Sequence, residues 1–155
     1  MKRETYWKVI RANMCGLNGI PYHVGENLFQ YVHGATYGTI YYTDIEHIFA
    51  YLNYGPLVCE CEIPPYAVVT KDSEQMHYSG IEIPIWHTTI LEIKQIHSLN
   101  NISTIKMLIN NGADISMDNY NLFKHAMMCN NKLYHWLVKH YPNEYELAKS
   151  ILESY

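Results

Sequence analysis

Arginine and long apolar runs are both scarce in this chain of 155 residues. Arg3 and Arg11 are its only arginines and the formal net charge is -4, so a surface that follows phosphates is poorly supplied and we expect no nucleic-acid partner. No run approaches the roughly 20 apolar residues of a membrane span, so no membrane partner is expected. The N-terminal MKRETYWKVI is charged and then aromatic, without the apolar core of a signal peptide, which predicts an intracellular protein.

The four cysteines are scattered and belong to no metal-binding motif. Because neither C-x-x-C, H-x-x-x-H nor H-E-x-x-H spacing occurs, the sequence predicts no metal site. Cys59 and Cys61 alternate with Glu60 and Glu62, which is typical of a strand with one face in the core and one in solvent. We therefore expect both cysteines to be reduced and buried together, and both glutamates to face outward.

What the chain does have is enough apolar surface for a folded core, since 48% of its residues are hydrophobic and 17% are charged. Residues 6 to about 96 follow the short period of strands. A helix is expected inside this part over residues 43–52, and a polar loop over residues 71–80. The expected strands are residues 6–10, 22–24, 38–43 and 57–63, with further strand-like spacing over 67–69 and 81–96.

From about residue 102 the apolar period becomes helical. Four short helices are expected, with a turn at Asp118 and Asn119 before the second, and with Phe123 and Trp136 in the core. The sequence thus predicts an α+β protein in which a β-rich domain, residues 1–96, packs against a helical module, residues 97–155. The expected helices cover residues 104–109, 122–128, 133–140 and 143–152.

The helical part resembles an ankyrin repeat. Residues 104–115, TIKMLINNGADI, are similar to the second helix and exit of a repeat, and residues 135–140 echo residues 106–111 after about 29 positions. About one and a half repeats are present, so the array must lean on the first domain, on a partner or on a second copy. The resemblance implies a protein-binding surface at the repeat turn and its aromatic neighbours: Asp114, Met117, Asp118, Tyr120 and Tyr134.

Residues 6–14, 41–48 and 54–64 resemble the opening domain of ankyrin-repeat proteins of mimivirus-type giant viruses. The resemblance implies a non-enzymatic module that binds a protein partner in the host cytoplasm. A structural role in the virion, and self-association through the apolar end of the short array, stay open beside it.

A second reading is an enzyme or a nucleotide-binding domain, because the order of elements over residues 6–69 is similar to that of ADP-ribosyltransferase-like domains. That resemblance implies NAD as cofactor and the helical part as a targeting arm. An early His23 or Arg11 would orient the dinucleotide, and a later Glu60 or Glu62 would stabilise the oxocarbenium-like centre. Tyr41 or Thr43 would lie between them. This chemistry requires the side chains to converge on one cleft.

Overall fold

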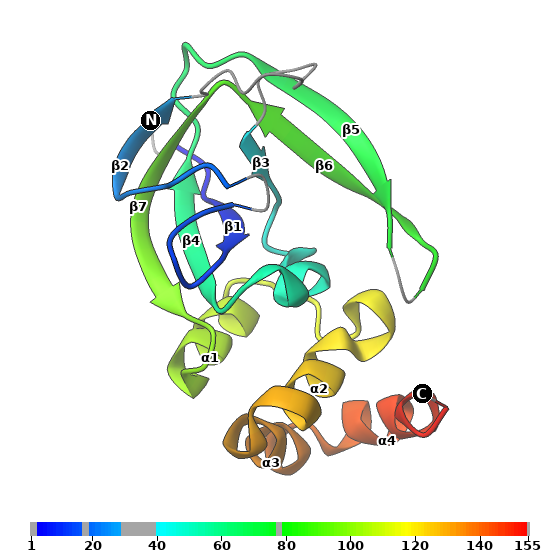
Figure 1. Cartoon of the computed structure of the whole chain (residues 1–155). Helices are drawn as coiled ribbons and strands as arrows, with labels where there is room; N and C mark the ends of the chain where they lie inside the picture. Colours follow the sequence, from blue (N-terminus) through cyan, green and yellow to red (C-terminus); the bar gives the residue numbers. More distant parts are fainter. Residues whose placement is uncertain (1–2, 17–18, 29–39, 77–78, 155) are drawn as a thin grey trace.

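The computed structural model describes residues 3–16, 19–28, 40–76 and 79–154, and it has the expected α+β composition. In the described chain the strands form two antiparallel sheets, one ordered β1-β4-β7-β2 and the other β3-β6-β5. Figure 1 shows the strands gathered at one end of the molecule and the α-helices at the other. The strands are β1 (Tyr6–Ile10), β2 (Gly25–Leu28), β3 (Ile40–Tyr42), β4 (Leu57–Glu62), β5 (Val69–Gln75), β6 (Glu82–Thr88) and β7 (Ile90–Ser98).

The first sheet buries the face that carries the two central cysteines. In β4, Cys59 and Cys61 are buried, while Glu60 and Glu62, which alternate with them, remain partly exposed, as the sequence predicts. A bulge between Glu60 and Cys61 shifts the pairing of β4 with β7. The residues packed on this face form one cluster: Ile10, Ile20, Tyr22, Ile40, Tyr42, Cys59, Cys61, Leu91 and Ile93.

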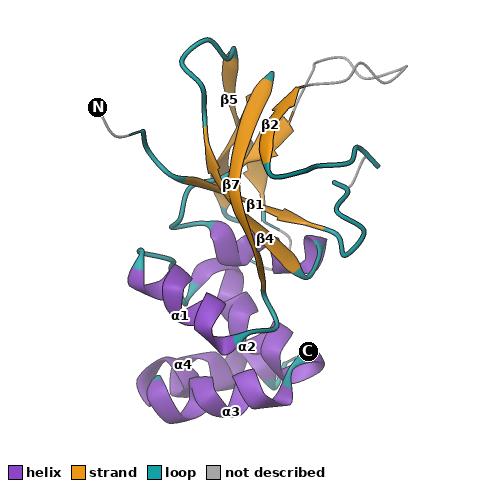
Figure 2. Cartoon of the chain, turned by 90° about the vertical axis from the view of Figure 1, so that its left-hand side faces the viewer, coloured by secondary structure: helices purple, strands orange, loops and turns teal. Residues whose placement is uncertain are grey.

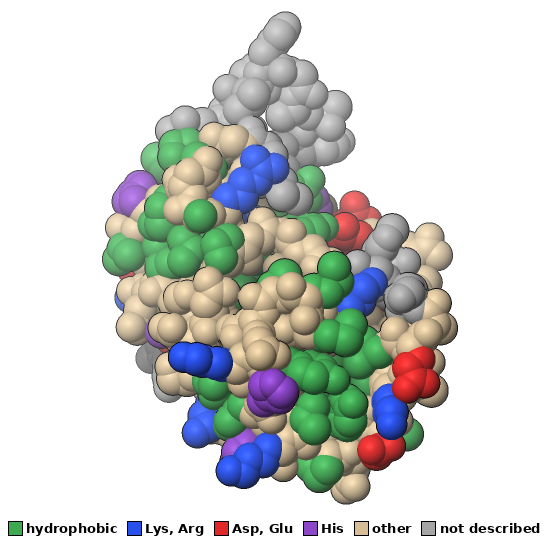
Figure 3. Space-filling model, turned by 60° about the horizontal axis from the view of Figure 1, so that its bottom comes forward, with side chains coloured by type: hydrophobic (Ala, Val, Ile, Leu, Met, Phe, Trp, Pro, Cys, Tyr) green, Lys and Arg blue, Asp and Glu red, His purple; other side chains and the backbone are tan. Residues whose placement is uncertain are grey.

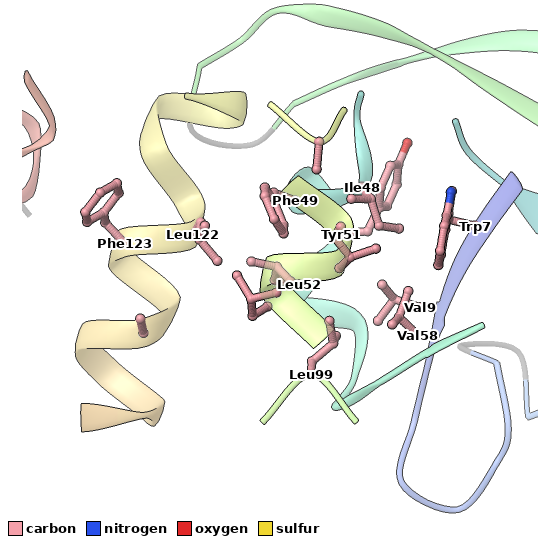
Figure 4. Packing of buried hydrophobic residues seen from close by; sticks show 14 of the residues in the cluster. Trp7, Val9, Ile48, Phe49, Tyr51, Leu52, Val58, Leu99, Leu122 and Phe123 are labelled. Carbon is pink, nitrogen blue, oxygen red and sulfur yellow. The ribbon is translucent and has the colours of Figure 1, made fainter. Parts of the chain in front are cut away.

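A larger cluster joins the strands to the helices (Figure 4). Trp7 and Val9 face it from β1, and Phe49 and Leu52 face it from the 3-10 helix η1 (Ile48–Tyr54). Leu122 and Phe123 enter it from α2 (Met117–Cys129), and the Asn121 amide donates a hydrogen bond to the Phe49 carbonyl over 2.9 Å. One continuous core therefore runs from β1 into the helices.

The helical part follows the predicted spacing. Besides α2 it contains α1 (Ile102–Asn110), α3 (Asn131–His140) and α4 (Pro142–Leu152), which lie together below the strands in Figure 2. Residues 118–120 have positive φ, so α2 is a regular helix only after this predicted turn. Phe123 is fully buried as expected, whereas Trp136 is only half-buried, with its ring tilted against His140 and edge-on to Tyr141.

Three expectations about the strand region are wrong. The helix expected over residues 43–52 begins only at Ile48 and is the 3-10 helix η1. It does not begin at Thr43, because the backbone N–H and C=O of Thr43 both pair with Trp7 and keep the chain extended there. The polar loop over residues 71–80 is largely strand β5. It is an edge strand exposed along almost its whole length, so it lacks the alternation that marks a strand. The strand expected at 22–24 begins instead at Gly25. By contrast, the strand expected at 38–43 is confirmed over its described residues, as β3.

Candidate functional site

The turn expected to bind a partner faces largely inward. Asp118 is 5% exposed, and its carboxylate accepts a hydrogen bond from the backbone N–H of Ser79 over 2.8 Å. Met117 and Tyr120 are half-buried against the large cluster. Asp114 is also half-buried, and its carboxylate accepts hydrogen bonds from Ser116 within its own turn. The predicted contact surface is therefore mostly committed to folding.

Exposed apolar surface lies elsewhere on the helices. Met127 and Met128 near the end of α2 are 48% and 72% exposed, and Leu147 on α4 is 62% exposed. Tyr134 is half-buried, with its hydroxyl hydrogen-bonded to that of Tyr145 over 3.3 Å. Figure 3 shows hydrophobic side chains gathered on the helical end, with charged groups at their edge. The sequence already indicated that these methionines are exposed. Ala126 lies on the buried face of α2, and Met127 and Met128, which follow it directly, cannot lie on the same face.

The residues of the NAD reading do not converge. Tyr41 and Thr43 line one cavity of the strand region, but neither Glu60 nor Glu62 does. Glu60 lies on the opposite face of β4 from the buried cysteines, 3.3 Å from the His97 imidazole. His23 is exposed beside a separate hollow next to β2, and Arg11 is exposed. Neither of the two glutamates expected to act with Tyr41, Glu60 and Glu62, lines the cavity that Tyr41 lines.

That cavity has a volume of about 570 Å³ and lies between β1, β3, η1, β5 and β6. Its walls contain Trp7 and five tyrosines. Its polar lining includes Lys8, Thr43, Asp72, Glu74 and His87. Glu74 accepts hydrogen bonds from the hydroxyls of two of the wall tyrosines, over 3.4 and 3.2 Å. The five tyrosines of the lining are Tyr22, Tyr41, Tyr42, Tyr51 and Tyr54.

Lys8 is the exceptional residue of this cavity. It is only 8% exposed, because its place in β1 directs it to the same face as Tyr6 and Ile10, opposite Cys59 of β4. Its ammonium donates to the Tyr41 carbonyl over 2.9 Å and lies 5.1 and 5.8 Å from the ring centroids of Tyr22 and Tyr41. Among the described residues no carboxylate forms an ion pair with it. Burial lowers the pKa of Lys8 to about 8, although the neighbouring thiols oppose that shift.

Two further polar groups of the same cavity lack hydrogen-bond partners within the described chain. They are the hydroxyl of Thr43, a residue 3% exposed, and Nδ1 of His87. The His87 ring lies 4.4 Å from the Tyr41 ring, and its pKa is lowered mainly by burial. Buried polar atoms are normally paired, since leaving one unpaired costs about 1–3 kcal/mol. The cavity thus holds three groups with unused hydrogen-bonding capacity.

Neither Lys8 nor His87 stood out in the sequence as a site residue. Lys8 had one signal, since a lysine in phase with Tyr6 and Ile10 on a short strand has its side chain on the buried face. His87 had none, because its neighbours in the cavity come from distant segments.

The described residues contain no group of three metal-ligating side chains, and none of their helices is long and apolar enough to cross a bilayer. Comparison with family models, curated proteins and solved structures finds no match to the chain.

Proposed function

We propose that this chain binds a small, planar organic molecule in the cavity beside Lys8. One observation carries the proposal. The lining of one aromatic cavity contains three buried polar groups, on Lys8, Thr43 and His87, that have few or no hydrogen-bond partners in the described chain. Sites for small molecules combine mostly apolar walls with a few converging polar groups in this way. Leaving such groups without partners costs free energy, and a ligand can supply the partners once the buried side chains turn toward it.

The charges of the cavity narrow the class of ligand. Asp72 and Glu74 line the β5 side, so a ligand with several negative charges, such as a dinucleotide phosphate, meets repulsion there. The tyrosine rings favour a planar molecule that stacks or packs edge-on. A neutral or singly charged aromatic compound with one polar end therefore fits better than NAD.

Thermal unfolding with three probes tests this proposal: 4-hydroxybenzaldehyde, 4-hydroxybenzoate and ADP-ribose. A ligand at about 100 times its dissociation constant adds roughly 2.7 kcal/mol to the free energy of unfolding. We expect stabilisation by at least one aromatic probe, lost in Lys8→Met and kept in Lys71→Met. Lys71 is a matched control, because its ammonium lies 5.6 Å from the Trp86 ring but outside the cavity. Equal loss in both variants, or stabilisation by ADP-ribose alone, would contradict the proposal.

A second candidate function is protein binding through the exposed methionines of α2. Met127 and Met128 support it, because adjacent exposed methionines form an adaptable apolar contact surface. Exposed Lys132 follows them in α3, which favours a partner with an apolar anchor and an acidic rim.

Site-specific photo-crosslinking tests this second function. A photo-reactive residue at position 128 should give one discrete crosslinked product in the cells that make the protein. The same residue at Ser150, which is exposed on α4, serves as the control and should give none. Crosslinking at both positions to the same set of products would indicate non-specific contact.

A further inference from the structure

We infer that the amine of Lys8 bonds covalently, as a Schiff base, to the carbonyl carbon of an aldehyde or ketone ligand held in this cavity. The inference rests on the proposed function and deepens it by naming the reactive class of ligand. It is carried by the position of the side chain. The ammonium nitrogen is buried in a cavity wall, held by the Tyr41 carbonyl and two ring faces, and has no carboxylate partner in the described chain.

Lys8 differs in this respect from the other lysines of the described chain. Lys71, Lys94 and Lys106 are exposed, and the same holds for Lys132, Lys139 and Lys149, while Lys124 is half-buried. An exposed lysine is almost wholly protonated near neutral pH, with about one amine in a thousand free at pH 7.4. Because the pKa of Lys8 is about 8, roughly a fifth of it carries a free lone pair at that pH. The nucleophilic form is thus populated at the cavity wall.

The bond changes balance without an oxidant or a reductant. The lone pair of Nζ attacks the carbonyl carbon, the N–C bond forms, and the carbonyl π electrons move to oxygen. One proton passes from nitrogen to that oxygen, giving a carbinolamine. Loss of water then forms the C=N bond, and addition of water reverses the process, so binding is reversible.

His87 and Thr43 can assist as proton carriers once their side chains turn toward the ligand, because their unpaired atoms are buried within the cavity wall. Both line the cavity, and His87 Nδ1 and Thr43 Oγ1 have no other hydrogen-bond partner in the described part of the chain. Burial lowers the pKa of His87, so its imidazole is neutral at neutral pH and can take and return a proton. The titratable groups that face Lys8 are two thiols of β4, the nearby phenols and imidazole, and two carboxylates of β5: Cys59, Cys61, Tyr22, Tyr41, His87, Asp72 and Glu74.

Reductive trapping in the full chain tests the inference. The wild-type protein is incubated with 4-hydroxybenzaldehyde and cyanoborohydride, which turns an imine into a stable secondary amine, and the modified peptides are mapped by mass spectrometry. Mapping also separates Lys8 from the N-terminal amine. At pH 7.4 we expect Lys8 to be modified at least about tenfold faster than Lys71, with a half-maximal rate near pH 8.

Two comparisons make failure of the inference distinguishable from failure of ligand binding. 4-Hydroxybenzyl alcohol has the same ring but no carbonyl group, so it can bind in the cavity without forming an imine. If aldehyde and alcohol both stabilise the protein while Lys8 stays unmodified, the cavity binds ligands and the Schiff base is wrong. If neither binds and labelling is spread over the exposed lysines, the proposed function fails as well.

Lys8→Arg supplies the matched variant, because it keeps the positive charge and removes the primary amine. It should abolish trapping at the cavity, whereas Lys71→Arg should leave Lys8 trapping unchanged. Trapping in wild-type protein decides the matter even if Lys8→Arg does not fold. Labelling of Lys8 no faster than of Lys71 overturns the inference.

Discussion

Burial of the Lys8 ammonium lowers the free energy of unfolding. Three N–H donors are buried there with one carbonyl acceptor and two aromatic faces in the described chain. A lowered lysine pKa means that the folded state resists protonation, because burial removes water from the ammonium. Such a cost is typical of a functional group rather than of a packing residue.

We predict that Lys8→Met is more stable than the wild type near pH 7, by up to roughly 3 kcal/mol for a pKa lowered from 10.5 to about 8. Between about pH 8 and 10.5 the unfolded chain binds more protons at Lys8 than the folded chain does. The stability of the wild type therefore rises through that window, and the advantage of the variant shrinks. Urea unfolding of both proteins at pH 7 and pH 10 measures this. A difference that does not change with pH would mean that Lys8 is not the source.

Thr43→Val should also stabilise the unliganded protein, by about 1 kcal/mol, and weaken ligand binding. Valine keeps the branched shape, and the backbone bonds of Thr43 to Trp7 do not involve the side chain. The substitution removes a buried hydroxyl that has no partner in the described chain. Thermal unfolding with and without 4-hydroxybenzaldehyde gives both quantities. A loss of stability without ligand would show that the hydroxyl is already paired.

Among the elements, η1 is positioned by a close contact between its end and strand β1. A Cβ added to Gly55, the residue that ends η1, would lie 2.1 Å from the carbonyl oxygen of Ile10. Because that atom belongs to the backbone of a strand, it cannot move aside without disturbing β1. Phe49 and Leu52 of η1 belong to the buried cluster shared with the helices, so a shift of η1 would disturb that cluster as well.

Gly55→Ala should therefore destabilise the fold by about 3 kcal/mol or more, at the upper end for overpacked sites. Asn53→Ala is the nearby control, since Asn53 is exposed on the same element and its loss should change stability by less than about 0.5 kcal/mol. Chemical denaturation of both variants provides the comparison. Equal stability of the two would mean that β1 and η1 separate easily.

The elements also show which features a sequence can predict. The helices after residue 102 were predictable because each carries its own amphipathic period. Strand β5 was not, since an exposed edge strand has no inward face to mark it. The candidate site was the least predictable. Burial of Lys8 depends on pairing with β4 and on Tyr41 of β3, which lie about 50 and 33 positions away.

Over the whole molecule, one hydrophobic cluster links the strands to the helices. Trp7 of β1 and Phe123 of α2 belong to the same buried group, with Phe49 and Leu52 of η1 between them in Figure 4. A core shared in this way favours cooperative unfolding, even though the sequence suggests a division near residue 96. The ankyrin and giant-virus resemblances stay predictions.

We predict a single unfolding transition for the strand and helical parts. Tryptophan fluorescence, which reports Trp7 and Trp86 in the strands as well as Trp136, should change together with helical circular dichroism. Phe123→Ala should lower both midpoints equally, at a cost of about 3–5 kcal/mol. Two separated transitions, with only the helical one shifted, would indicate independent units.

The central claim is that the cavity beside Lys8 is a ligand site, and chemical-shift mapping with 4-hydroxybenzaldehyde and 4-hydroxybenzyl alcohol tests it most directly. The account predicts saturable shifts centred on Lys8, Tyr41 and His87, whose side chains line one cavity. It predicts no comparable shifts at Met127 and Met128 on the helical end. Saturable shifts confined to those methionines, or no shifts at Lys8 with either compound at millimolar concentration, would contradict it.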